Sequence, residues 1–139
     1  MTAHSTISAT AVPTTGRPAL LRFALRLDAA VTAVNAIAYL ALCWVLDDWL
    51  GVPAAFLAAV GVSLLAFAAF VGRLSTRPAP GRLAVAAVIA VNVLWVLDSV
   101  LLLVVDGFGP TLAGQVVVAV QAAGVAGLAA LQYAGLRRA

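Results

Sequence analysis

Residues 29–35 read Ala-Ala-Val-Thr-Ala-Val-Asn, and residues 86–92 repeat them as Ala-Ala-Val-Ile-Ala-Val-Asn. Asn35 and Asn92 are the only asparagines in the chain, and each lies within a long apolar run. A rare polar residue at matching positions of two such runs predicts two copies of one structural unit. We therefore expect both asparagines near the middle of the molecule.

The composition of the chain predicts a membrane protein. Hydrophobic residues make up 65% of the 139 residues and charged residues 9%. A soluble domain has about 45–50% apolar and about 25% charged residues, so this composition cannot supply a water-soluble surface. The chain has room for four spans with short loops, and none for a separate soluble domain.

Four apolar runs follow a segment, residues 1–19, that is rich in Ser, Thr, Ala and Pro. This segment predicts a disordered cytoplasmic tail, since it has no hydrophobic periodicity and no signal-peptide pattern. The remaining residues, 20–139, form the predicted transmembrane domain. Its spans are about 27–46, 53–72, 83–105 and 111–136. Each reaches the ~20 residues that a membrane helix needs, and no run alternates as a barrel strand would. The predicted fold is an all-α bundle of four transmembrane helices.

The charged residues predict the orientation of the bundle. All eight basic residues are arginines that flank the spans on one side: Arg17, Arg22, Arg26, Arg73, Arg77, Arg82, Arg137 and Arg138. The opposite loops contain only acidic charge, from Asp47, Asp48 and Asp106. The positive-inside rule therefore predicts that both termini are cytoplasmic, and we expect the protein in the plasma membrane. Because the basic charge lies at span ends, it indicates a membrane face and no nucleic-acid partner.

The proposed repeat extends into the two acidic loops. Residues 48–53 read Asp-Trp-Leu-Gly-Val-Pro, and residues 106–110 read Asp-Gly-Phe-Gly-Pro. In each copy the proline is expected at the first position of the next helix, where its fixed φ and missing N–H cost nothing. We predict two tandem, parallel helical hairpins, about 25–77 and 82–138, related by a pseudo-twofold axis along the membrane normal.

Polar residues recur on one face of three of the predicted helices. They are Asp28, Thr32, Asn35 and Tyr39 on the first span, Asn92, Ser99 and Asp106 on the third, and Gln121 and Gln132 on the fourth. Lipid offers such side chains no hydrogen bond, so they are expected to turn toward a shared interior. One interpretation is hydrogen-bonded packing between helices, including a direct pair of asparagines. The other is a polar pocket that orients a ligand.

Two aspartates within the apolar runs suggest different roles. Asp98 lies inside the third span, where an acid costs roughly 2.5–3.5 kcal/mol and indicates a functional site by default. We expect it to be partly protonated, or hydrogen-bonded to Ser99, a glutamine or water. Because it points about 120° away from Asn92, it could face the bundle interior, a different helix or a second subunit. Asp28, beside arginines at the start of the first span, is expected to cap the helix or form an ion pair.

Small residues recur every four positions on the second and fourth spans. They are Ala55, Ala59 and Ser63, then Ala119, Ala123 and Gly127. This spacing allows backbones to approach closely, so we predict tight packing at these faces, within the chain or between subunits.

Several residue types that enzymes use are absent from the predicted bundle. The single histidine, His4, lies in the tail, and the chain has no glutamate and no lysine. Histidine-built haem or metal sites are therefore not available, and Ser63 and Ser99 have no base nearby. We expect no cofactor, no metal and no catalytic residue, and regard an enzyme as the less favoured class.

The layout of the whole chain resembles the small, uncharacterised four-span integral membrane proteins of actinobacteria. Small multidrug-resistance transporters are similar in size, but they depend on a glutamate in the first membrane helix. Thr32 and Asn35 cannot supply that carboxylate, so the likeness to that family does not extend to function.

The leading hypothesis is a non-enzymatic membrane protein that binds, and in one version transports, a small or lipophilic molecule. Its site residues would be Asn35, Asn92, Tyr39, Asp98, Ser99 and Gln121. The alternative is a structural or accessory subunit that packs on itself or on a larger membrane partner through its small-residue faces. A third version, a lipid-modifying enzyme, would require activity that depends on Asp98.

Overall fold

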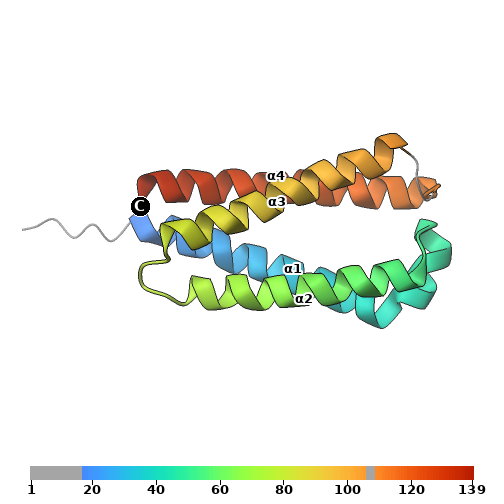
Figure 1. Cartoon of the computed structure of the whole chain (residues 1–139), viewed down its shortest axis with the longest axis horizontal. Helices are drawn as coiled ribbons and strands as arrows, with labels where there is room; N and C mark the ends of the chain where they lie inside the picture. The colour runs from blue at the N-terminus through green and yellow to red at the C-terminus, as the bar shows by residue number, and fades with distance from the viewer. Residues whose placement is uncertain (1–16, 106–108) are drawn as a thin grey trace, which may run out of the picture.

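The computed structural model describes residues 17–105 and 109–139, with side chains from residue 19 onward. These residues form four α-helices: α1 (Arg17–Leu50), α2 (Ala54–Ser75), α3 (Arg82–Val105) and α4 (Leu112–Arg138) (Figure 1). The prediction of an all-helical, four-helix bundle is confirmed. Most of the predicted tail and the loop residues 106–108 lie outside the described residues.

All four helices are long and apolar enough to cross a membrane. Only 17–22% of the residues in their most apolar stretches are buried inside the chain, so most of their apolar side chains are at least partly exposed. A soluble bundle would turn its apolar stripe to the core and its polar face outward. The described chain is therefore a multi-pass membrane protein with four candidate spans.

The first helix is longer than predicted. It contains 34 residues, or about 50 Å at 1.5 Å per residue, and begins ten residues before the predicted start at Leu27. Its early turns bury Leu21 and Leu25 against Val71 of α2 and Val85 of α3. This packing explains why the helix continues through the arginine-containing segment, which hydropathy alone excludes from a span.

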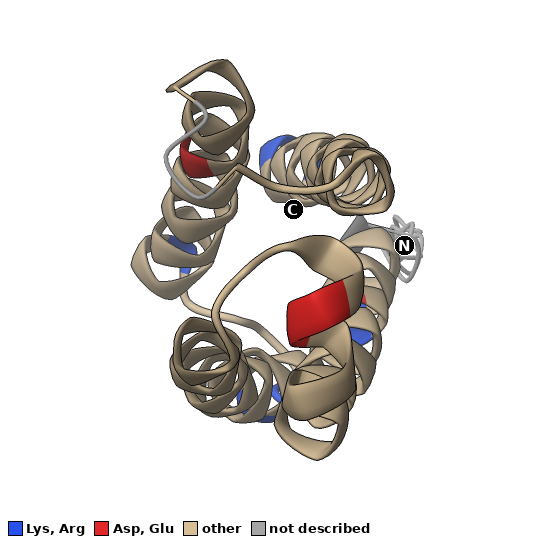
Figure 2. Cartoon of the chain, turned by 90° about the vertical axis from the view of Figure 1, so that its right-hand side faces the viewer, with Lys and Arg blue, Asp and Glu red and all other residues tan. Residues whose placement is uncertain are grey.

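The helices pack in an incomplete ring. Helix α1 lies against both α2 and α4, and α4 lies against α3, whereas α2 and α3 scarcely touch (Figures 1 and 2). The two hairpins, α1–α2 and α3–α4, are thus joined mainly through α1 and α4. A gap in the packing remains between α2 and α3.

Glycines allow the closest helix approaches, and they are not the residues predicted for this role. A Cβ atom on Gly135 of α4 would lie 2.9 Å from the Cα atom of Leu21 on α1. A Cβ atom on Gly61 of α2 would lie 3.2 Å from the carbonyl oxygen of Ala36 on α1. The six predicted packing residues are instead exposed within the chain: Ala55, Ala59, Ser63, Ala119, Ala123 and Gly127. Their docking on another protein stays a prediction.

The two ends of the bundle carry opposite charges. The arginine end contains the starts of α1 and α3 and the ends of α2 and α4, and all arginines of the described residues lie there. The turn end contains residues 50–54 and 109–112, with Asp47 and Asp48 in the last turn of α1 (Figure 2). Trp44 and Trp49, also near the turn end, are 78% and 61% exposed.

At the turn end, Thr111 joins the two hairpins. Its hydroxyl donates to the carbonyl of Trp49 across 2.6 Å, and its backbone N–H donates to the carbonyl of Leu50 across 3.1 Å. The same hydroxyl accepts the N–H of Gly114 and so caps α4. Gly51, with φ of +69°, makes the turn after α1 and lies directly against this segment.

The prolines of the turns lie slightly earlier than predicted. Pro53 is the N-cap of α2 and Pro110 precedes the N-cap of α4, so neither occupies the first helical position. Thr111 takes the capping role instead, because its hydroxyl can satisfy an otherwise unpaired N–H at the helix start. The acidic loop at residues 106–110 lies partly outside the described residues, which omit 106–108. Its likeness to the loop at residues 48–53 therefore stays a prediction.

Candidate functional site

A buried carboxylate lies at the centre of the polar interior. The Oδ1 atom of Asp28 accepts the hydroxyl of Thr32 at 3.1 Å. Its Oδ2 atom accepts the amides of Asn92 at 2.8 Å and Gln132 at 2.5 Å. The Asn92 amide also donates to Gln132 Oε1 at 3.0 Å. These four residues, the Asp28 network, connect α1, α3 and α4 and are all buried.

The role predicted for Asp28 is wrong. Because α1 begins at Arg17, Asp28 lies well inside the helix and cannot cap its start. It is 1% exposed, and within the described residues it forms no ion pair. Its charge is instead surrounded by neutral donors, an arrangement that fixes helix positions because an unpaired buried carboxylate is costly.

A second polar cluster lies farther toward the turn end. The Tyr39 hydroxyl on α1 donates to Gln121 Oε1 on α4 at 2.8 Å. The amide of Gln121 donates to Asn35 Oδ1 at 3.4 Å, a long and therefore weak bond. The two asparagines thus belong to separate clusters. The interpretation in which they pair directly is wrong.

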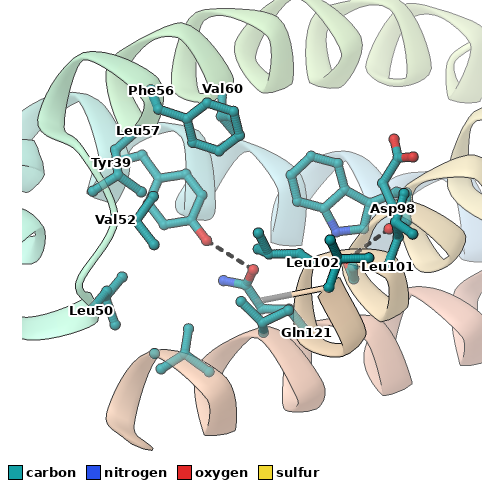
Figure 3. A pocket seen from close by; sticks show the side chains of 16 residues that line it. Tyr39, Leu50, Val52, Phe56, Leu57, Val60, Asp98, Leu101, Leu102 and Gln121 are labelled. Atoms are coloured by element: carbon teal, nitrogen blue, oxygen red, sulfur yellow. Dashed lines mark hydrogen bonds between the residues drawn. The ribbon is translucent and has the colours of Figure 1, made fainter. Parts of the chain in front are cut away.

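The larger cavity of the described residues lies between the hairpins, near the turn end (Figure 3). Its volume is about 470 Å³. All four helices line it, mainly with apolar side chains, and the Tyr39–Gln121 pair lies across it from Asp98 (Figure 3). Phe56 of α2 and Leu101 of α3 are exposed at its edge, so the cavity opens between these two helices.

A smaller cavity, of about 140 Å³, lies toward the bundle centre. Its polar lining includes Thr32, Asn35 and Asn92. Trp95 and Gln121 line both cavities and therefore lie at the boundary between them. The polar interior thus continues from the larger cavity, past these two residues, to the Asp28 network.

Two neighbouring residues of α3 differ in how their polar groups are satisfied. The buried Ser99 hydroxyl donates to the carbonyl of Trp95 at 2.7 Å, so it is not a partner of Asp98. Asp98 is exposed and lines the larger cavity. Among residues 19–105 and 109–139, the structure gives its carboxylate no hydrogen bond and no ion pair.

The six predicted site residues are divided between the two cavities. Tyr39, Asp98, Ser99 and Gln121 line the larger one, whereas Asn35, Asn92 and again Gln121 line the smaller one. The site hypothesis omitted Asp28, Trp95 and Gln132. The polar stripes on the first and fourth spans already contained Asp28 and Gln132. Trp95 had no such signal, because an aromatic residue in a membrane helix usually faces lipid or core.

The arrangement offers binding chemistry. Within the described residues there is no group of three or more His, Cys, Asp or Glu side chains that could hold a metal ion. The cavity provides apolar walls, an amide, a phenol and one carboxylate, which can orient a ligand by hydrogen bonds and charge.

Comparison with known proteins found no matching family model, no matching curated protein and no matching solved structure.

Proposed function

We propose that this membrane protein binds a small lipophilic molecule in the larger cavity between its two hairpins. One observation carries the proposal: α2 and α3 make far less contact with each other than the other neighbouring helices do. A gap of this kind exposes apolar side chains and forfeits packing energy, unless a ligand or lipid fills it. Transport of the same molecule would be an extension of this binding role.

The cavity chemistry supports a ligand that is mostly apolar and carries a polar group. Ligand sites are commonly 300–1,000 Å³ and mainly apolar, with a few fixed polar groups. The volume of about 470 Å³ lies in this range. Tyr39 holds Gln121 Oε1 through a 2.8 Å bond, and the Gln121 amide nitrogen, which donates one hydrogen to Asn35, belongs to a residue that lines both cavities. Such a fixed amide would orient a carbonyl or hydroxyl of the ligand.

The charge distribution supports a defined orientation for this site. Every arginine lies at one end, so by the positive-inside rule we propose that the arginine end is cytoplasmic and the turn end is outside. The larger cavity would then open in the outer half of the plasma membrane. We also propose that the hairpins descend from one repeated unit, whose copies now differ in how they pack.

The second candidate function is that of a structural subunit, and a separate observation favours it. All six small residues predicted for packing are exposed within the chain. Because they would let another helix approach closely, they suit contact with a second copy or a larger membrane partner. This function predicts that Ala59→Phe and Ala123→Phe lower the mass of the purified particle, while changes in the cavity leave it unaltered.

Ligand-dependent thermal stability tests the binding proposal. Neopentylbenzene, an apolar probe, should raise the unfolding temperature of the purified protein as its concentration increases. At one hundred times the dissociation constant the expected stabilisation is about 2.7 kcal/mol. Val117→Phe should abolish the shift, because residue 117 lines the cavity. Val116→Phe is the matched control, since Val116 is 53% exposed and does not line the cavity. Equal shifts in both variants would reject the site.

A further inference from the structure

We propose that the ligand of the larger cavity is a lipophilic cation, with an apolar body and an ammonium or similar group. This inference rests on the proposed function, because it names the chemical class of the same ligand. It depends on the charge at the cavity, on the charges nearby and on the aromatic lining.

Among the described residues that line the larger cavity, Asp98 alone is charged. Asp98 is exposed, and the described residues give its carboxylate no hydrogen-bonding or ionic partner. Asp28 provides the contrast within the same protein. That carboxylate is buried and accepts three hydrogen bonds from neutral groups, so its structural role is complete. Among the described residues, Asp98 accepts no such hydrogen bonds.

The described residues around the cavity add negative charge and supply no compensating base. Asp47 and Asp48 lie in the last turn of α1, at the same end of the bundle. Every arginine of the described residues lies at the opposite end. Low-dielectric walls strengthen such a field, so a cation is attracted to this end and an anion is repelled.

Aromatic side chains are a further feature of the cavity lining that favours a cationic ligand. Tyr39, Phe56 and Trp95 all line the cavity. Aromatic faces attract a cation within about 6 Å, and tryptophan does so best. A neutral lipophilic ligand would use the apolar walls but gain nothing from Asp98. A cation with an apolar body would use both, which is why this class fits the whole lining.

The test compares benzyltrimethylammonium with neopentylbenzene, which has the same shape but carbon in place of the charged nitrogen. Trp44→Phe and Trp49→Phe leave Trp95 as the only tryptophan of the chain, so its emission reports from the cavity wall. Both replaced residues are largely exposed. Titrations in nanodiscs of one lipid composition then give the affinity of each probe, because partitioning into lipid is the same for every variant.

The test depends on the ratio of the two affinities, that is, the preference for the cation over its neutral isostere. We expect Asp98→Asn to lower this preference about tenfold, the effect of losing about 1.4 kcal/mol of charge interaction. Asp48→Asn, at the same end but not in the cavity lining, should lower it much less, because that carboxylate acts only through the longer-range field. An unchanged preference in Asp98→Asn, or no preference in the parent protein, would overturn the inference while neopentylbenzene binding still supported the site. Failure of both probes to saturate would overturn the inference and the proposed function together.

Discussion

The side-chain amide of Asn92 on α3 donates to the Oδ2 atom of Asp28 on α1 across 2.8 Å, although 64 positions separate them in the chain. Helices α1 and α3 are not packed as neighbours in the ring of helices. The bond therefore reaches across the interior and links the two hairpins. It gives one of the two repeated asparagines a structural role that the other does not share.

Asn92→Leu should destabilise the protein by about 2 kcal/mol, because it leaves a buried carboxylate with fewer donors. Asn35→Leu is the matched control at the repeated position. It removes one long bond to a half-buried glutamine, so its cost should approach the ~0.6 kcal/mol average for polar contacts in membranes. Reversible unfolding in mixed micelles measures both. Equal costs would contradict the division into two clusters.

Asp28→Leu should cost less stability than Asn92→Leu, by about 1 kcal/mol. Removing the carboxylate leaves Asn92 and Gln132 bonded to each other at 3.0 Å, whereas removing Asn92 leaves a buried charge. The same unfolding assay ranks the two variants. If Asp28→Leu proved the more damaging, an unpaired charge could not be the main penalty in this network.

Gly135→Ala should weaken the contact of α4 with α1 by about 1–3 kcal/mol, since overpacking forces helices apart. The new methyl group would meet the backbone of Leu21 at 2.9–3.1 Å. Gly127→Ala, on the same helix, has nothing within 4 Å and should leave stability unchanged or raised. Unfolding of the two single variants compares these sites. A neutral Gly135→Ala would mean that α1 and α4 are farther apart than described.

Single-cysteine labelling should confirm the orientation proposed from the arginines. In a Cys43→Ala background, Asp48→Cys at the turn end should react with an impermeant maleimide in intact cells. Ala79→Cys, in the loop after α2, should react only after the membrane is permeabilised. Both positions are exposed, so burial does not limit either reaction. The reverse labelling pattern would invert the protein in the membrane and move the larger cavity to the cytoplasmic half.

The helices were predictable because hydropathy over about 20 residues depends on composition alone. The predicted ends of the second, third and fourth spans differ from α2, α3 and α4 by at most three residues. The start of α1 was not predictable in this way. Leu21 and Leu25 extend the helix by packing on other helices, and no local property of an arginine-containing segment reveals that contact.

The sequence predicts that these polar side chains face the interior, but not which of them form hydrogen bonds with each other. The spacing of Asn35, Asn92 and Gln121 placed them correctly toward the centre, because polar groups avoid lipid. Which amide meets which carboxylate depends on the relative height and rotation of whole helices. Among surfaces of alanine, valine and leucine, many such arrangements have similar packing energy. For the same reason, the sequence does not predict the gap between α2 and α3. It also does not predict which glycines allow α1 to approach its neighbours closely.

The most direct test of the binding site is a titration of the protein that retains only Trp95 with neopentylbenzene, followed by tryptophan emission. We expect a saturable change in the parent protein and in Val116→Phe, and no saturable change in Val117→Phe. A linear, unsaturable response shared by all three proteins would show partitioning into lipid alone. That result would contradict the claim that the space between α2 and α3 is a ligand site.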